Sequence, residues 1–274
     1  MFPATHCTHC QGSDESIENP VHHPTYEITP KCNLNCIYCY SNVALKKGKA
    51  PMPGYYGDTE DVRSITLSQY GEPLVAGIDE VERVARELKD MFPQARLDLQ
   101  TNGILLNEKA IKRLEKYFEL AMVSLDVSSK EKYARITGFD GFDILMDNLK
   151  ALSSSSIRGV IRTIYMPGIN DKDVFELAEL ANRLNMEVFL QPLSVYDKEL
   201  MESHGLDMER TEDIVEFLDV TERLREIADV RIPGCFIVNV RRIERDFGRE
   251  YLKLIRRNAL AEVPEMKRER KFVL

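Results

Sequence analysis

The sequence predicts an α/β protein built on a parallel β-sheet. Six segments have the composition of buried strands, and segments whose apolar residues recur at helical spacing separate most of them. These connections are too long for hairpins, and parallel neighbours need crossover connections of this kind. The length of 274 residues suits one large α/β domain or two small ones. A composition of 43% hydrophobic and 30% charged residues is typical of globular proteins with a sizeable core.

The elements follow one another in a regular alternation. The predicted strands lie at residues 26–29, 64–69, 96–101, 120–125, 158–165 and 187–191. Apolar residues at spacings of three and four predict helices in residues 78–91, 107–118, 130–135, 142–152 and 174–184. Asn107 is a favourable N-cap for the second of these helices. Residues 41–63 are interrupted by glycine and proline, and we expect a loop there.

Beyond the sixth strand the pattern weakens. We expect a helix at 211–227, an extended segment at 230–238 with a kink at Pro233-Gly234, a helix at 246–261 and a frayed tail at 264–274. The chain therefore divides into three regions by sequence. They are an N-terminal extension with a Cys-x2-Cys pair (1–24), the α/β core (25–195) and a mostly helical C-terminal extension (196–274).

Three cysteines with close spacing follow the first predicted strand. Cys32, Cys36 and Cys39 stand four and three residues apart, so one loop can wrap their thiolates round one side of a 4Fe–4S cluster. Three ligands leave the fourth iron open to a substrate or cofactor, and Tyr38 could shield the cluster from water. The alternative is a zinc site or a chance grouping. Zinc prefers four ligands, often as two Cys-x2-Cys pairs, which fits this triplet less well.

This Cys-x3-Cys-x-Tyr-Cys pattern resembles the signature of the radical S-adenosylmethionine (SAM) superfamily. The resemblance implies a partial (β/α)6 TIM-like barrel with N- and C-terminal extensions, and a reaction chamber at the C-terminal ends of the strands. It implies that the open iron binds the amino and carboxylate groups of SAM. One electron from the reduced cluster then releases a 5′-deoxyadenosyl radical, which abstracts hydrogen from a substrate. A reducing donor similar to ferredoxin or flavodoxin is the implied partner.

The segment Tyr70-Gly71-Glu72-Pro73-Leu74 follows the second strand. It resembles the Gly-Gly-Glu motif of the superfamily, which binds the SAM amino group, but Tyr70 replaces the first glycine. The Gly-Glu-Pro-Leu form is similar to molybdopterin-precursor cyclases, glycyl-radical activating enzymes and tRNA wybutosine synthases. In physical terms, Gly71 and Pro73 shape a turn in which backbone carbonyls and Glu72 can face an ammonium group.

Polar side chains at the other strand ends are further candidates for cofactor binding. They are Thr101, Asn102, Ser124, Asp126, Arg162 and Gln191. Asn102-Gly103 is equally well explained as a simple turn. Ser124 and Asp126, which resemble the Ser-Leu-Asp of the molybdopterin cyclases, could bond ribose hydroxyls.

Arg162 lies on an otherwise apolar strand and needs a partner if it is buried. The carboxylate of SAM is one candidate, since a guanidinium fork matches a carboxylate. An internal salt bridge to Asp98, Asp126 or Glu72 is the other. Gln191, at the end of the sixth strand, is a candidate residue of the chamber.

Three more cysteines remain, Cys7, Cys10 and Cys235. The N-terminal extension and the segment after the sixth strand could meet at one rim of a barrel, where these thiols would hold a second cluster. The first alternative is zinc bound by Cys7, Cys10 and two histidines. Those histidines would come from His6, His9, His22 and His23. The second alternative is that Cys235 is a buried core thiol.

The composition also limits the class of function. The net charge of −8 argues against a polyanion-binding surface over the whole molecule. Residues 241–274 hold eleven Lys or Arg against six Asp or Glu, the one feature that favours an RNA-modifying enzyme. A non-catalytic iron–sulfur or zinc protein, acting as electron carrier or scaffold, is the other alternative. A small molecule, a peptide or protein, and an RNA all remain open as substrates.

The cysteine usage bears on location. Six cysteines without a recognisable secretory or transit segment lead us to expect a cytoplasmic protein with metal-binding thiols and no membrane partner.

Overall fold

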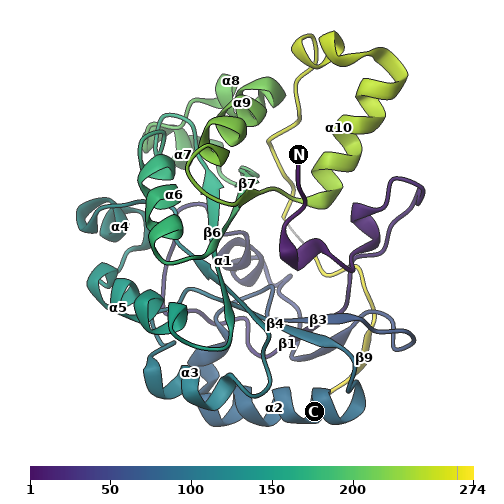
Figure 1. The fold of residues 1–274 in the computed structure, drawn as a ribbon, viewed down its shortest axis with the longest axis vertical. Helices are drawn as coiled ribbons and strands as arrows, with labels where there is room; N and C mark the ends of the chain where they lie inside the picture. The colour runs from purple at the N-terminus through teal and green to yellow at the C-terminus, as the bar shows by residue number, and fades with distance from the viewer. Residues whose placement is uncertain (264) are drawn as a thin grey trace. The chain divides into compact units, whose positions relative to one another are not determined.

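The computed structural model describes residues 1–263 and 265–274. The chain forms two compact units, and Figure 1 traces it through both. Unit 1 consists of Met1–His22, Leu125–Ser128 and Ile161–Glu262. Unit 2 consists of His23–Ser124, Ser129–Val160 and Val263–Leu274.

Unit 2 contains most of the parallel sheet. Its strands are ordered β5 (Leu120–Ser124), β4 (Arg96–Thr101), β3 (Ser64–Leu67), β1 (Thr25–Glu27), β2 (Gly54–Tyr56) and β9 (Arg270–Phe272). The first four are parallel to one another, whereas β2 and β9 are antiparallel to their neighbours. Every residue of β3 is buried, as expected for a parallel strand that is covered on both faces.

The helices of unit 2 are amphipathic and bury one face each. They are α1 (Tyr40–Lys46), α2 (Ile78–Met91), α3 (Glu108–Leu114), α4 (Lys130–Thr137) and α5 (Phe142–Ser153), with a 3-10 turn η3 (Pro73–Ala76) before α2. In α2 the buried residues Val81, Val84, Ala85 and Leu88 recur at spacings of three, one and three. The helices α2 and α3 lie side by side in Figure 1. The predicted N-cap is confirmed, because Ala110 N donates to Asn107 Oδ1 at 3.0 Å.

Unit 1 continues the α/β alternation. The strand β6 (Arg158–Tyr165) enters it at Ile161 and is followed by β7 (Glu187–Pro192) and β8 (Val230–Arg231), in the sheet order β8-β7-β6. Its helices are α6 (Asp173–Arg183), α7 (Lys198–Ser203), α8 (Met208–Glu212), α9 (Ile214–Arg225) and α10 (Gly234–Phe247). Three 3-10 turns complete it: η1 (Thr5–Cys7), η2 (Gln11–Ser13) and η4 (Arg249–Lys253).

The six predicted strands are confirmed as β1, β3, β4, β5, β6 and β7. The loop predicted for residues 41–63 is wrong, because it contains most of α1 and all of β2. The helix α1 is short and is capped by the thiol of Cys39, a residue type that is not a usual N-cap. The strand β2 forms by pairing with β1, where Tyr55 lies opposite Tyr26, 29 residues earlier in the chain. The local pattern of glycine and proline gives no indication of this pairing.

The C-terminal predictions need similar correction. The segment 230–238 is extended only in β8, since α10 begins at Gly234. The helix predicted at 246–261 is wrong, because α10 ends at Phe247 and Gly248 has φ +82°. The prediction of a frayed tail at 264–274 is wrong for residues 270–272, because β9 pairs with β2 and Phe272 stacks on Tyr55 with 4.7 Å between ring centroids. Residue 264 of that prediction lies outside the described residues. No helix in the described residues is long and apolar enough to cross a membrane.

Candidate active site

The loop that carries Cys32, Cys36 and Cys39 follows β1 in unit 2 and is fixed at several points. Asn35 N donates to Thr137 O at 2.8 Å and Ile37 N to Ile136 O at 3.0 Å, which ties the loop to the end of α4. Asn42 N donates to Cys39 Sγ at 3.5 Å, so this thiol caps α1. The backbone of the loop is therefore held in place by hydrogen bonds to α4.

The three thiols are chemically suited to an iron–sulfur cluster. They are free cysteines, and each is partly exposed. Cys32 Sγ accepts hydrogen bonds from Leu34 N at 3.4 Å and from Asn102 Nδ2 at 3.6 Å, and such bonds to sulfur are one way in which proteins tune clusters. Burial raises the pKa of the Cys32 thiol, an effect that the Leu34 N–H opposes. Tyr38 lies partly exposed just before Cys39.

The ligand count favours a cluster over a zinc ion. The loop offers three thiols, the ligand type of iron–sulfur clusters, and none of them is in a disulfide. A structural zinc ion takes four ligands, often as two Cys-x2-Cys pairs, and this loop holds a single triplet. The residues of this loop therefore fit the group that the sequence predicts.

The turn after β3 packs directly on the cysteine loop. Gly71 N donates to Ser41 Oγ at 2.7 Å, and Glu72 N donates to Lys31 O at 2.8 Å. Gly71 has φ +69°, and a Cβ atom there would lie 2.1 Å from Thr29 O. Only glycine meets both conditions, so this position is fixed by a close backbone approach.

The side chain of Glu72 points into the protein. Its carboxylate accepts hydrogen bonds from Asn102 N at 2.6 Å, Leu74 N at 3.1 Å and Thr101 Oγ1 at 2.9 Å. The residue is 1% exposed, and burial raises the pKa of its carboxyl to about 7. The carboxylate therefore positions the ends of β3 and β4, and the backbone of the turn is the part that remains suited to an ammonium group.

Tyr70, which departs from the Gly-Gly-Glu pattern, is accommodated in the interior. Its ring lies 5.1 Å from that of Tyr40 in an edge-to-face arrangement, with an interplanar angle of 81°. Its backbone N donates to Glu27 Oε2 at 2.9 Å, and the hydroxyl of Tyr40 donates to Gln69 O. The substitution thus adds a buried aromatic pair beside the turn.

Two candidates in unit 1 come together. Arg162 donates through Nε to Gln191 Oε1 at 2.6 Å, a pairing between β6 and β7 that the sequence did not suggest. Asp126 is buried and accepts from Ile164 N at 2.6 Å. Asp98, one of the predicted ion-pair partners of Arg162, pairs instead with Arg96 at 2.6 Å.

The remaining candidates for cofactor binding lie at the ends of β4 and β5, as the sequence predicts. Thr101 and Asn102 are buried at the end of β4, where both bond Glu72. Ser124 is the last residue of β5 and is partly buried. Asn33 was not among the residues predicted for the site. Its Oδ1 accepts from Asn102 Nδ2 at 2.7 Å, and its position directly after Cys32 is the feature of the sequence that could have identified it.

The second set of cysteines is gathered in unit 1. Cys7 and Cys10 are each 8% exposed, and Cys235 lies in the first turn of α10. Burial raises the pKa of the Cys7 thiol to about 12, and the nearby thiols of Cys10 and Cys235 raise it further. His22 joins them, with 3.1 Å between its Nδ1 and Cys10 Sγ.

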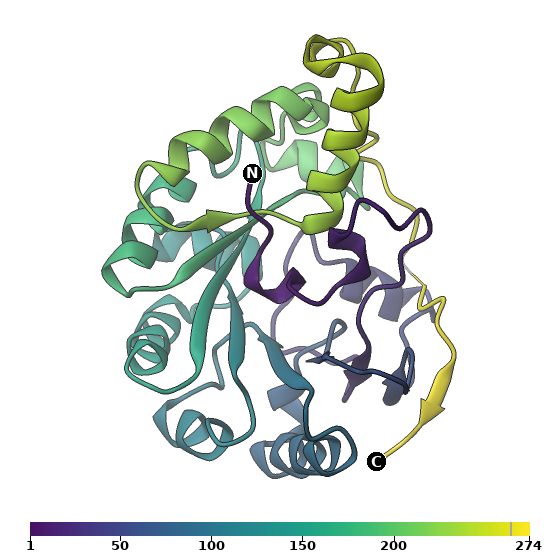
Figure 2. The ribbon, with the colours of Figure 1, turned by 45° about the vertical axis from the view of Figure 1, so that its right-hand side comes forward.

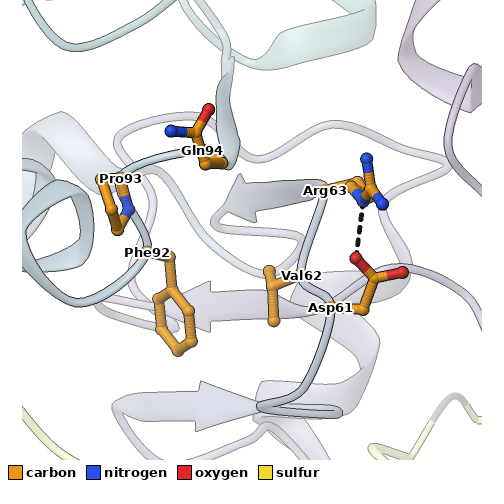
Figure 3. A pocket seen from close by; sticks show the side chains of 6 residues that line it. All are labelled: Asp61, Val62, Arg63, Phe92, Pro93 and Gln94. Atoms are coloured by element: carbon orange, nitrogen blue, oxygen red, sulfur yellow. Dashed lines mark hydrogen bonds and ion pairs between the residues drawn. The ribbon is translucent and has the colours of Figure 1, made fainter.

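A surface hollow of about 460 Å³ in unit 2 is not part of this site. Figure 3 shows it beside the ion pair of Arg63 and Asp61, whose Nε and Oδ1 are 2.7 Å apart. Its lining residues are Asp61, Val62, Arg63, Phe92, Pro93 and Gln94. They precede β3 and β4, whereas the cysteine loop follows the carboxyl end of β1. The hollow therefore lies at the end of the parallel strands opposite to the usual position of barrel chemistry.

Comparison with known proteins matches the region that carries these residues. Residues 26–181 match the model of the family described as the radical SAM superfamily. An uncharacterized protein of Methanocaldococcus jannaschii is 37% identical over 270 residues, which are 96% of this chain and 90% of that protein. A GTP 3′,8-cyclase of Synechocystis is 28% identical over 177 residues, and a probable GTP 3′,8-cyclase of Pyrococcus abyssi is 26% identical over 173 residues. The matched parts are 61% of this chain and 53% and 55% of the two cyclases.

Solved structures agree with the fold. SuiB of Streptococcus suis, bound to its precursor peptide SuiA, matches with a TM-score of 0.55 at 14% identity over 78% of this chain and 50% of SuiB. SuiB bound to S-adenosylmethionine gives a TM-score of 0.53 at 15% identity over 76% of this chain and 46% of SuiB. The predicted α/β fold of the partial-barrel type is confirmed.

Proposed function

The chain belongs to the radical SAM superfamily and is a radical SAM enzyme, and from this premise we propose that Cys32, Cys36 and Cys39 bind its 4Fe–4S cluster. The single observation that carries the assignment is the loop of three free thiols, with a side-chain amide and a backbone N–H directed at Cys32 Sγ. When bound and reduced, this cluster supplies the electron that cleaves SAM to a 5′-deoxyadenosyl radical.

The residues of this chain position the reactants. In the proposal, the turn at Gly71 offers backbone groups to the amino group of SAM, and the buried Glu72 carboxylate keeps that turn in place through Asn102 and Thr101. Tyr38, beside Cys39, limits access of water to the cluster. Hydrogen bonds within the loop hold the thiols in a fixed arrangement before the cluster is assembled.

Candidates for other groups of the cofactor are proposed within each unit separately. In unit 1, Nε of Arg162 is held by Gln191, so the two terminal nitrogens of the guanidinium can donate to a carboxylate, and Asp126 is a candidate acceptor for a hydroxyl. In unit 2, Ser124 at the end of β5 is a candidate for a ribose hydroxyl. A ferredoxin- or flavodoxin-like protein is proposed as the electron donor, and a cytoplasmic location is proposed because none of the six cysteines is in a disulfide.

The experiment is SAM cleavage by the full chain. Protein purified anaerobically and reduced with dithionite should convert SAM to 5′-deoxyadenosine, measured by chromatography. Cys36→Ala should abolish the product while circular dichroism stays unchanged. Lys46→Ala, at an exposed position of α1, is the control and should retain SAM cleavage. Comparable yields from wild-type and Cys36→Ala protein would contradict the assignment.

RNA modification is not the function that the structure favours. Several basic side chains of residues 241–274 bond to the protein itself. Arg242 Nη2 donates to Glu15 O and Ile17 O, Arg257 Nε to Thr211 O, and Arg268 Nη1 to His23 O. These groups are used in holding the terminal segments, which removes much of the support that the local charge gave to an RNA partner.

A further inference from the structure

We propose that Cys7, Cys10 and Cys235 bind a second iron–sulfur cluster and that His22 donates a hydrogen bond to the sulfur of Cys10. All four residues belong to unit 1. None of them takes part in the loop of Cys32, Cys36 and Cys39, so the two assignments can be tested separately.

The N-terminal segment presents its two thiols on adjoining 3-10 turns. Cys7 ends η1, and Cys10 is the N-cap of η2. Cys10 N donates to Cys7 O at 3.1 Å, and Ser13 Oγ donates to the same oxygen at 3.0 Å. These bonds close the Cys-x2-Cys loop tightly, so that both thiols can face one ligand.

The third thiol arrives from α10, more than 200 residues later. Figure 2 shows the N-terminal segment beside the beginning of this helix. A Cβ atom on Gly234 would lie 1.9 Å from Ser13 Oγ, and one on Gly12 would lie 3.4 Å from Cys235 Cβ. The two glycines therefore permit a close approach between η2 and α10, and this approach places Cys235 beside the Cys-x2-Cys loop.

The N-terminal segment is also anchored to α10 and to Ile232, two residues before that helix. Ala4 N donates to Ile232 O at 3.0 Å, and Ile232 N donates to Phe2 O at 3.2 Å. Arg242 Nη2 donates to Ile17 O at 2.7 Å from the middle of α10. Residues 1–22 are thus bonded to the chain on either side of Cys235, and a metal centre bound there would add to these contacts.

The ligand set favours a cluster over zinc. Cys7, Cys10 and Cys235 are three thiols, the ligand type of iron–sulfur clusters, and none of them is in a disulfide. A closed zinc site takes four ligands and would need His22 as the fourth, but this imidazole lies 3.1 Å from Cys10 Sγ, a hydrogen-bonding distance.

His22 lies at the edge of this group rather than in its centre. Its Nδ1 is 3.1 Å from Cys10 Sγ, and its Cε1 lies 3.1 Å from the place of a Cβ on Gly12. Ligands to two different irons of one cluster would be further apart than 3.1 Å. The imidazole is therefore a positioning group that donates to the ligand sulfur, and hydrogen bonds to sulfur raise the reduction potential of a cluster by stabilising its more negative, reduced form.

The first test separates the two centres by metal content. The full-length triple variant Cys32→Ala, Cys36→Ala, Cys39→Ala is reconstituted anaerobically with iron and sulfide. We expect about four irons per chain and a reduced-state EPR signal that SAM does not alter. Adding Cys235→Ala to the triple variant should remove both the bound iron and the EPR signal. Failure of the triple variant to hold iron, or one zinc per chain in its place, would overturn the proposal.

The second test addresses His22 by its effect on the potential. In the triple variant, His22→Phe keeps the ring but removes the donor, and it should move the midpoint potential of the remaining cluster to a more negative value. His9→Phe is the matched control, because His9 is exposed in the same Cys-x2-Cys loop. An unchanged potential in His22→Phe, with iron retained, would overturn the hydrogen-bonding role.

Discussion

The side-chain amide of Asn102 lies 3.6 Å from the sulfur of Cys32 and 2.7 Å from the side-chain oxygen of Asn33. The backbone N of Asn102 donates at the same time to Glu72 Oε2. One residue at the end of β4 thereby joins the cysteine loop to the turn after β3. The two motifs that the sequence presents 40 residues apart are held together by this residue.

Asn102→Ala should weaken retention of the cluster by the loop. Loss of a hydrogen bond to a charged group costs about 1.5–3 kcal/mol, which corresponds to roughly 10- to 150-fold faster loss of iron. The measurement is the rate of iron transfer to a chelator under anaerobic conditions. Asn107→Ala is the control, because it removes an N-cap at a cost of about 1 kcal/mol without contacting the loop. Equal rates in the two variants would show that Asn102 does not support Cys32.

Gly71→Ala should disrupt the turn after β3 much more than Gly48→Ala disrupts its own loop. Both glycines have nearly the same backbone angle, φ +69° and +67°, but a Cβ at Gly48 meets nothing within 4 Å. The left-handed conformation costs about 1–2 kcal/mol at either site. The clash with Thr29 O adds to that cost only at Gly71. Urea unfolding checks the difference, and matching losses of stability would mean that the close approach is not constrained.

Glu72 should make stability fall as the pH rises. Its carboxyl has a pKa of about 7 in the folded protein against 4.5 as its ordinary value. Between these values the folded chain holds a proton that the unfolded chain has released. The stabilising contribution is therefore complete below pH 4.5 and is lost as the pH passes through 7, by at most about 1.4 kcal/mol per pH unit.

Glu72→Gln should remove this dependence, because an amide does not titrate in the range. The measurement is the free energy of unfolding of the cluster-free chain at several values between pH 5 and pH 8. Glu27→Gln is the comparison for a second buried carboxyl. Burial also raises the pKa of Glu27, but the carboxylate of Glu27 accepts a hydrogen bond from Tyr70 N. Parallel curves for the wild type and Glu72→Gln would contradict the prediction.

Phe272→Ala should destabilise unit 2 through loss of aromatic packing. The Phe272 ring stacks on Tyr55 at 4.7 Å and lies 6.5 Å from Phe92. We expect a loss of about 2–3 kcal/mol, somewhat below the value for a fully buried ring. Val273→Ala is the matched control, since Val273 is 57% exposed and should change stability by less than about 0.5 kcal/mol. Similar thermal midpoints for both variants would mean that β9 contributes little.

Local patterns in the sequence predicted much of the architecture and of the candidate site. The six parallel strands are visible because each is a short apolar run bounded by turn residues, and the helices are visible through their spacing. The spacing of Cys32, Cys36 and Cys39 and the Gly71-Glu72-Pro73 turn were readable for the same reason, since each motif lies within a few consecutive residues. These signals need no knowledge of distant contacts.

Only the tertiary structure decided what depends on residues far apart in the chain. It brought Cys235 beside Cys7 and Cys10, paired Arg162 with Gln191, directed the Glu72 carboxylate inward and made a strand of residues 270–272. The reason is physical: each of these outcomes is a contact between segments whose separate patterns are weak. The energy that fixes them comes from packing and hydrogen bonds that exist only once the chain has closed on itself.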